Sequence, residues 1–216
     1  KNELSIEPLA HLTCAGASKE ELGRVIDDLG EIGVENILAL RGDPPKGQGG
    51  YTVAEGGFAY ASELVSFVHD RGDFCVGAAC YPEVHPEATD APTDLKHLKH
   101  KVDCGVDFLL TQLFFDNQVF VDFEARARAA GIDIPMIPGI MPVSNTKQVE
   151  RFTSMCGASI PPVLSNRLKS LGDDPVEVFW AGVLYASHQC RDLLAPESNS
   201  PFGPSKRGAP GIHFYA

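Results

Sequence analysis

The sequence predicts an α/β fold in which the strands of a parallel sheet alternate with helices. Short apolar runs of strand length recur along the chain, and most are followed by a polar strand end and a segment with helical periodicity. With 216 residues the chain is long enough for one complete domain. Such alternation is typical of an (α/β) barrel or of a doubly wound sheet. The predicted strands lie near residues 9–14, 36–41, 74–80, 108–114, 136–140 and 212–215.

The first unit is a strand, a helix and a second strand. Leu9–Cys14 is short and mostly apolar, and Ser18 with Glu21 three positions later has the pattern of a capping box. Gly33 ends the helix, and the apolar run at 36–40 completes a βαβ unit. The helix is expected to bury the face that carries Leu22, Val25, Ile26, Leu29 and Ile32.

The next two units repeat this order. Residues 46–57 are polar and glycine-rich, and we expect a loop over the strand ends there. A helix from about Ala59 to Gly72 precedes the strand at 74–81, and a helix near Thr93 to Cys104 precedes the strand at 107–116.

The last third of the chain is mainly helical. Asp116 can cap a helix that ends at Gly131, and Ser144 with Asn145 can cap one that ends near Gly157. The helix after Asp116 carries one apolar face, formed by Phe120, Phe123, Ala127 and Ala130. The elements expected elsewhere in this third are a strand interrupted by proline and glycine at 135–142, helices near 161–171 and 175–194, a loop at 195–211 and a terminal strand.

Composition excludes several classes of function. Eighteen basic and 29 acidic residues give a net charge of -11, which argues against binding nucleic acid or an anionic membrane through overall charge. No apolar run reaches the roughly 18 residues of a membrane span, and the first residues lack the apolar segment of a signal peptide, so a cytoplasmic location is expected. The cysteines are scattered without a C-x-x-C pair, and we interpret them as buried free thiols: Cys14, Cys75, Cys80, Cys104, Cys156 and Cys190.

Polar residues follow almost every predicted strand. The run Ile37–Leu40 stops at Arg41, Gly42 and Asp43, before two prolines that cannot continue a ladder. A capped turn explains this stretch equally well when it is taken alone. Because the carboxyl ends of parallel strands gather around a ligand, the recurrence favours a shared polar site. The strand-end residues are His11, Thr13, Arg41, Asp43, Tyr81, His85, Thr111, Gln112, Asp116 and Tyr215.

A metal site is not expected. His85, His97 and His100 lack the spacing of an H-E-x-x-H helix, and no cysteine pair lies nearby. The serines and cysteines likewise match no nucleophile motif. Neither metal chemistry nor a covalent nucleophile is therefore predicted.

Five motifs at the strand ends carry a family resemblance. They are H-L-T-C from His11, L-R-G-D from Leu40, Y-P-E-V-H-P-E from Tyr81, T-Q-L-F-F-D from Thr111 and I-P-G-I-M-P-V-S-N from Ile137. In this order and spacing they resemble methylenetetrahydrofolate reductases from about His11 to Phe152, and Phe214-Tyr215 resembles the family's last strand. The resemblance implies a (β/α)8 TIM barrel formed by a single domain, 1–216, with its first two βα units missing from this chain.

The resemblance also implies an activity. Members of the family are flavoproteins that use FAD to carry hydride from NADH or NADPH to 5,10-methylenetetrahydrofolate, giving 5-methyltetrahydrofolate in one-carbon metabolism and methionine biosynthesis. The expected partners are therefore a folate and NAD(P)H, with neither nucleic acid nor membrane, and we expect a homo-oligomer. The alternative is a non-catalytic fragment or subunit that binds flavin or folate.

The family pattern assigns FAD to a set of residues in this chain. Asp94, His97 and Lys101 lie at i, i+3 and i+7 on one helix stripe, where a cation suits a pyrophosphate and a carboxylate suits a ribose hydroxyl. Without the resemblance, a solvated helix face is the better interpretation of this stripe. The residues expected to bind FAD are His11, Leu40, Arg41, Gly42, Asp43, Tyr60, Ala61, Ala79, Tyr81, His85, Asp94, His97, His100 and Lys101.

The same pattern assigns the folate substrate. Asp43 is the expected catalytic residue, because a carboxylate can accept from the adjacent N–H donors of a pterin while Gln112 offers a donor and an acceptor. Gln148, Phe152 and Tyr215 resemble further substrate residues, although Phe152 fits a core position equally well.

The chain differs from the family pattern in three respects. The family's general-acid glutamate and a threonine precede the H-L-T-C strand, and neither is found here. Six predicted strands are two fewer than a closed barrel needs. His100 stands where many members carry arginine, so Lys101 is the expected cation for the pyrophosphate.

Overall fold

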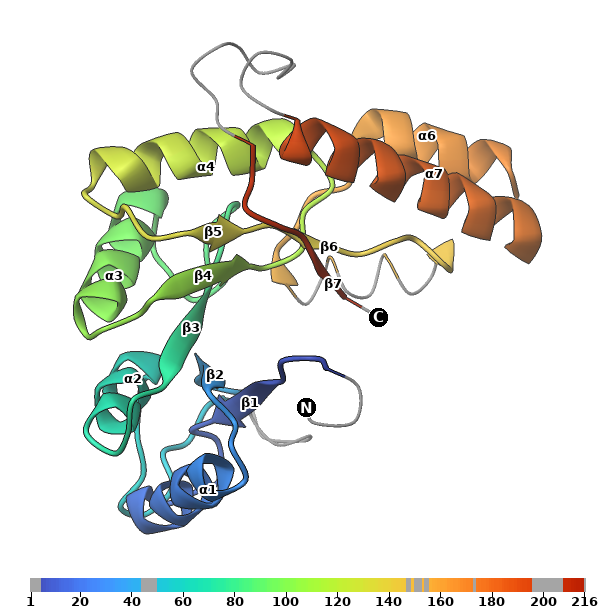
Figure 1. The fold of residues 1–216 in the computed structure, drawn as a ribbon. Coiled ribbons are helices and arrows are strands. Elements are labelled where there is room, and N and C mark those ends of the chain that lie inside the picture. Colours follow the sequence, from blue (N-terminus) through green and yellow to red (C-terminus); the bar gives the residue numbers. More distant parts are fainter. Residues whose placement is uncertain are drawn as a thin grey trace. The chain divides into compact units, whose positions relative to one another are not determined.

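The computed structural model describes residues 5–43, 50–146, 149, 153, 156–172, 174–195 and 208–215. The chain forms two compact units, and we treat each by itself. Unit 1 consists of residues 1–79 and 97–109, and unit 2 of residues 80–96 and 110–216. Strands and helices alternate along the first two thirds of the chain, as the sequence predicts (Figure 1).

Unit 1 is built on parallel strands. β1 (Leu9–Thr13) pairs with β2 (Asn36–Leu40), and β2 pairs with β3 (Cys75–Cys80), both in parallel. The ladder places Thr13 opposite Leu40 and Ala39 opposite Ala78. Their carboxyl ends therefore lie at one edge of the sheet, which confirms the predicted parallel α/β arrangement for these strands.

The helices of unit 1 connect these strands. α1 (Lys19–Glu31) links β1 to β2, α2 (Ala61–His69) links β2 to β3, and the second half of α3 (Ala91–Asp103) completes the unit. α2 begins two residues later than predicted, at Ala61 rather than Ala59. The Glu63 carboxylate accepts from the Ala59 and Tyr60 N–H groups, which leaves these residues outside the helix as its cap.

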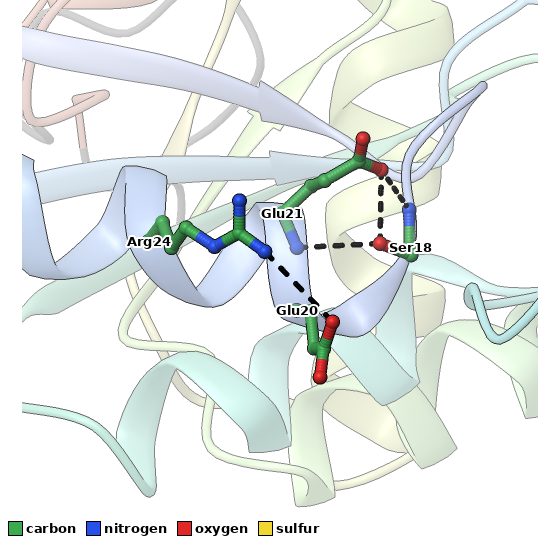
Figure 2. A network of polar contacts seen from close by, with 4 residues as sticks. All are labelled: Ser18, Glu20, Glu21 and Arg24. Carbon is green, nitrogen blue, oxygen red and sulfur yellow. Dashed lines mark hydrogen bonds and ion pairs between the residues drawn. The ribbon is translucent and has the colours of Figure 1, made fainter.

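The start of α1 is the predicted capping box. The Ser18 hydroxyl accepts from the Glu21 N–H at 3.3 Å, and the Glu21 carboxylate accepts from the Ser18 N–H at 2.8 Å (Figure 2). Two backbone donors that a helix start leaves unpaired are thereby satisfied. Figure 2 also shows Glu20 pairing with Arg24 on the exposed side of the same turn.

Several burial predictions for unit 1 are wrong, and among them Leu29 and Cys104 are only half-buried. Leu22 and Ile26 are buried, but Val25 is 43% and Ile32 is 74% exposed. Ile32 follows the last helical residue as the C-cap, where the chain has already left the buried stripe, and Val25 lies at the margin of that stripe. Cys75, predicted to be buried, is exposed at the first position of β3. Of the other cysteines, Cys14 and Cys80 are buried as predicted, whereas Cys104, Cys156 and Cys190 are only half-buried.

Unit 2 begins with the last residue of β3 and the first half of α3, and continues with β4 (Phe108–Thr111) from Leu110. The predicted strand at 108–114 ends three residues early, because the Gln112 side chain accepts from the Leu113 N–H and takes it out of the ladder. The predicted strand at 136–140 is divided by Pro138, which has no N–H, into β5 (Met136–Ile137) and β6 (Gly139–Ile140). β6 pairs in parallel with β7 (His213–Phe214), two residues shorter than predicted.

The helices of unit 2 agree with the sequence. Asp116 caps α4 (Asn117–Ala129), and α6 (Pro162–Ser170) and α7 (Pro175–Leu194) lie side by side (Figure 1). Residues 146, 149, 153 and 156 are helical, as predicted, but the bounds of that helix and most of the predicted loop at 195–211 lie outside the described residues.

The core of unit 2 gathers under α6 and α7. Leu113, Phe115, Met141, Val143 and Val178 form one buried cluster. Polar bonds join α4 and its N-terminal flank to α7. Gln189 Nε2 donates to Asn117 Oδ1 at 3.2 Å, the Tyr185 hydroxyl donates to the Phe115 carbonyl at 2.6 Å, and burial raises the pKa of this tyrosine. In the described part of the chain, no helix is both long enough and apolar enough to cross a membrane.

The capping box gives a first prediction. Ser18→Ala should lower the free energy of unfolding by about 1 kcal/mol in urea denaturation, because the Glu21 N–H loses its acceptor. Glu20→Ala is the matched control, since the Glu20–Arg24 pair at 3.8 Å joins side chains that are 88% and 73% exposed. An equal loss in both variants would contradict the capping role.

The effect should also depend on pH. Hydrogen bonds from Ser18, the backbone N–H first, lower the pKa of Glu21 from its ordinary value of 4.5. A lowered folded-state pKa stabilises the fold above the unfolded pKa and is lost as pH falls through the folded value. Ser18→Ala keeps this backbone donor and removes only the hydroxyl donor, so the hydroxyl's share of the stability difference should be lost as the pH falls below 4.5.

Candidate functional site

The carboxyl ends of β1, β2 and β3 form the candidate site of unit 1. Because the strands are parallel and in register, Thr13 and Leu40 lie at the same edge. Arg41, Gly42 and Asp43 follow Leu40 directly, and Asp43 is exposed. The charges of the L-R-G-D motif are therefore brought to the strand ends.

Gly42 makes the turn after β2 possible. Its φ is +84°, and a Cβ built on it would lie 2.9 Å from the Ala15 Cβ and 3.0 Å from the Thr13 Cβ. An L-residue is disfavoured at this φ, and there is also no room for its side chain. The backbone of the turn thus packs directly on the end of β1.

Cys14 holds this end of the sheet together. Its N–H donates to the Leu40 carbonyl at 3.1 Å, and its thiol lies 3.4 Å from that oxygen and 3.8 Å from the Tyr60 carbonyl. Burial, with the Glu63 charge, raises the pKa of the Cys14 thiol to about 11, so the thiol is a protonated donor at neutral pH. Cys14 thus connects β1 both to the end of β2 and to the residue before α2.

Arg41 contacts an aromatic residue that sequence reasoning did not select. Its guanidinium carbon lies 5.0 Å from the centroid of the Tyr51 ring, within range of a cation–π interaction. The Tyr51 hydroxyl donates to the Phe58 carbonyl at 3.0 Å, and burial raises the pKa of this phenol. An aromatic residue within the polar, glycine-rich stretch 46–57 is unusual, and this feature of the sequence could have identified Tyr51.

α3 contributes a cation to unit 1. Lys101 Nζ donates to the Ala79 carbonyl at 2.6 Å, which places an ammonium group at the carboxyl end of β3. His97 and His100 on the same helix are exposed. In the described residues, no group of three or more His, Cys, Asp or Glu side chains is arranged to hold a metal.

The remaining predicted residues of unit 1 lie around these groups. His11 is exposed on β1 opposite Leu38. Tyr60, 64% exposed, is the N-cap of α2, and Ala61 is its first residue.

In unit 2, the Y-P-E-V-H motif forms a compact turn. The Tyr81 and His85 rings meet edge to face, with centroids 4.5 Å apart. The His85 N–H donates to Asp94 Oδ2 at 3.0 Å, and His85 Nδ1 accepts from the Glu87 N–H at 3.1 Å. Asp94 therefore supports the turn through a contact with its backbone.

Gln112 and Tyr215 are both anchored at the end of β4. Gln112 Oε1 accepts from the Leu113 N–H at 2.9 Å. The Tyr215 hydroxyl donates to the Thr111 carbonyl at 2.9 Å, and the Thr111 hydroxyl accepts from the Gly139 N–H at 2.8 Å. Burial raises the pKa of Tyr215 to about 12, so its hydroxyl is a fixed donor. Gln148 and Phe152 lie outside the described residues.

Comparison with known proteins identifies the family. The family model described as methylenetetrahydrofolate reductase matches residues 1–216. The chain belongs to the methylenetetrahydrofolate reductase family.

Two curated members illustrate the similarity. The 5,10-methylenetetrahydrofolate reductase of Pectobacterium carotovorum subsp. carotovorum is 38% identical over 100% of this chain and 66% of its own length. Methylenetetrahydrofolate reductase (NADH) 1 of Arabidopsis thaliana is 38% identical over 90% of this chain and 35% of its own. The chain thus spans about two thirds of the bacterial methylenetetrahydrofolate reductase and about one third of the plant one.

A solved structure shares the fold. It is an uncharacterised protein from Clostridium thermocellum that binds two copies of 5-methyl-5,6,7,8-tetrahydrofolic acid. The TM-score is 0.62 at 19% identity, over 98% of this chain and 66% of that one. The fold of this family member is therefore found in a distant protein as well.

The turn after β2 gives a second prediction. Gly42→Ala and Gly33→Ala both place an L-residue at positive φ, +84° and +80°, which costs about 1 to 2 kcal/mol. A Cβ at Gly33 meets nothing within 4 Å, whereas one at Gly42 meets the end of β1. Gly42→Ala should therefore lower the free energy of unfolding by about 1 to 3 kcal/mol more than Gly33→Ala in urea denaturation. Equal losses would show that the close approach to β1 is not tight.

Proposed function

We propose that this chain is the catalytic part of an FAD-dependent reductase that converts 5,10-methylenetetrahydrofolate to 5-methyltetrahydrofolate with NADH or NADPH. The observation that carries the proposal is that charged groups lie at the carboxyl ends of parallel strands in a chain of this family, with Asp43 after β2 and Lys101 at the end of β3. FAD would supply the hydride transfer, which no protein side chain performs.

The residues of unit 1 fit a flavin nucleotide. The turn at Gly42 packs against the end of β1, so the backbone groups of residues 41–43 have fixed positions for a ligand to contact. Lys101 is held as a cation at the strand end, where it can bind a pyrophosphate through charge-assisted bonds even though His100 is not an arginine. His11, Leu40, Arg41, Tyr60, Ala61, Ala79 and His97 complete the proposed contacts of this unit.

The residues of unit 2 would contribute separately to the cofactor. Tyr81 and His85 offer an aromatic pair, and Asp94 holds the His85 backbone rather than serving only as a ribose ligand. We assign Tyr81, His85 and Asp94 to FAD on this basis.

Asp43 and Gln112 would read the pterin. The exposed Asp43 carboxylate can accept from the pterin amino edge. Because Gln112 Oε1 already accepts from Leu113, its Nε2 group is the donor that we assign to a pterin acceptor. Tyr215, whose hydroxyl is bonded to Thr111, would act by packing, and Gln148 and Phe152 remain proposed contacts to the rest of the folate.

The proposed function also implies a fold and a domain organisation. We infer that the parallel strands belong to a (β/α)8 barrel and that residues 1–216 act as one catalytic domain. A homo-oligomer in the cytoplasm is part of this proposal. None of the residues of this chain is proposed as the general acid.

A second candidate function is ligand binding without catalysis. It is favoured by one observation, the fold shared with a Clostridium thermocellum protein that binds 5-methyltetrahydrofolate. The two functions separate experimentally. A reductase should show flavin absorbance bands that bleach on adding NADH or NADPH anaerobically and return on adding 5,10-methylenetetrahydrofolate, whereas a binding protein should show no such cycle.

Lys101 gives a third prediction. Lys101→Ala should weaken FAD binding by about 1 to 3 kcal/mol, the size of a charge-assisted hydrogen bond, in a titration followed by flavin fluorescence. Lys99→Ala is the matched control, because Lys99 on the same helix pairs with the exposed Asp103. If both variants retained wild-type affinity, the assignment of Lys101 would be wrong.

Asp43 gives a fourth prediction. Asp43→Asn keeps the shape but places a donor against the pterin donors, so the folate should bind about 1 to 3 kcal/mol more weakly. Stopped-flow absorbance measures the step with nicotinamide and the step with folate separately. We expect the folate step to slow. A variant slowed only in the nicotinamide step would contradict the assigned role.

A further inference from the structure

The turn at residues 82–85 contains a strained residue. Val84 has a φ of 107°, and only one other non-glycine residue of the described chain, Ser5, has a positive φ. For a β-branched side chain this region of φ is a genuine outlier. Such a conformation persists only where the surroundings hold it, and these outliers concentrate at functional sites.

Three separate segments hold this turn on both sides of Val84. Arg126 of α4 donates to the Pro82 carbonyl at 3.4 Å. Glu83 Oε1 accepts from the Ser159 N–H at 2.9 Å, and the His85 N–H donates to Asp94 of α3 at 3.0 Å. The residues flanking Val84 are therefore each fixed by a polar contact with another part of unit 2.

The segment that carries Ser159 also packs on the turn. A Cβ on Gly157 would lie 3.5 Å from Pro86 and 3.9 Å from the Val84 carbonyl oxygen. Of the three contacts, that of Glu83 is the one that joins the turn to this segment, through its carboxylate and the Ser159 N–H. All three contacts involve a charged side chain, and such bonds are stronger than neutral ones.

The result of this fixation is a defined His85 ring. The ring meets Tyr81 at an interplanar angle of 66°, and its Nδ1 accepts from the Glu87 N–H. A neutral imidazole that accepts at Nδ1 carries its proton on Nε2. The turn therefore presents Tyr81 and His85 in one orientation and one tautomer.

We propose that Glu83 is a positioning residue for the flavin contact. By holding the strained turn on Ser159, it keeps Tyr81 and His85 arranged for the cofactor before the cofactor binds. This inference rests on the proposed function, because Tyr81 and His85 are assigned to FAD there. Preorganisation of this kind raises affinity by removing the cost of ordering the site on binding.

The test compares three variants. Glu83→Ala should weaken FAD binding about tenfold in a fluorescence titration, whereas Glu83→Gln, which keeps the Oε1 acceptor, should stay within about twofold of wild type. Asp174→Ala is the matched control, since Asp174 also accepts from backbone N–H groups of unit 2, at the start of α7. It should lower stability and leave the FAD affinity unchanged.

A readout without flavin separates this inference from the proposed function. In long-range 1H–15N spectra of the apoprotein, His85 should show the Nε2–H tautomer in wild type and Glu83→Gln, and a mixture in Glu83→Ala. Loss of the single tautomer in Glu83→Ala alone supports the positioning role even if wild type binds no FAD, which would refute the proposed function. An unchanged His85 tautomer in Glu83→Ala would overturn the inference, and so would equal FAD affinity in wild type and Glu83→Ala when wild type binds FAD.

Discussion

The close approach of the Arg41–Asp43 turn to the end of β1 is the constraint on which the candidate site of unit 1 depends. Gly42 can lie against Thr13 and Ala15 only because it has no side chain and adopts a φ of +84°. The Cys14 thiol and N–H both point to the Leu40 carbonyl just before that turn. Two neighbouring strand ends thus behave as one piece, and the charges of Arg41 and Asp43 take their positions from it.

In unit 2, polar contacts rather than close packing fix the backbone around the candidate site. The 82–85 turn is fixed by Arg126, Glu83 and Asp94, and the end of β4 is fixed by bonds from Tyr215 and Gly139 to Thr111. In both units the groups assigned to ligands project from backbone that other residues hold. That arrangement is what precise ligand geometry requires.

Local signals predicted the fold well. The Ser18–Glu21 spacing located the start of α1, and Asp116 located the start of α4, because capping depends on residues three or fewer positions apart. Periodicity could not locate the end of β4, where the Gln112 side chain competes for the Leu113 N–H. The proline and glycine that interrupt the strand at 135–142 were visible in the sequence, but not that β6 pairs with β7, more than 70 residues later.

The site was predicted less completely, because its supports are distant in sequence. The strand-end pattern led to Arg41 and Asp43, and the family resemblance led to Lys101, but no local pattern shows that the Tyr215 hydroxyl bonds to a carbonyl 104 residues earlier. Cys14 was interpreted only as a buried thiol, since its acceptors lie 26 and 46 residues away. The strain at Val84 was likewise invisible, because a β-branched residue normally excludes that φ.

Hydrogen–deuterium exchange with and without FAD shows whether the strand ends of this chain hold the cofactor. Adding FAD should slow exchange at residues 40–43, 79–85 and 97–101 and leave α6 and α7 unchanged. Protection confined to α6 and α7, or no protection at a saturating FAD concentration, would show that FAD is not held at the strand ends.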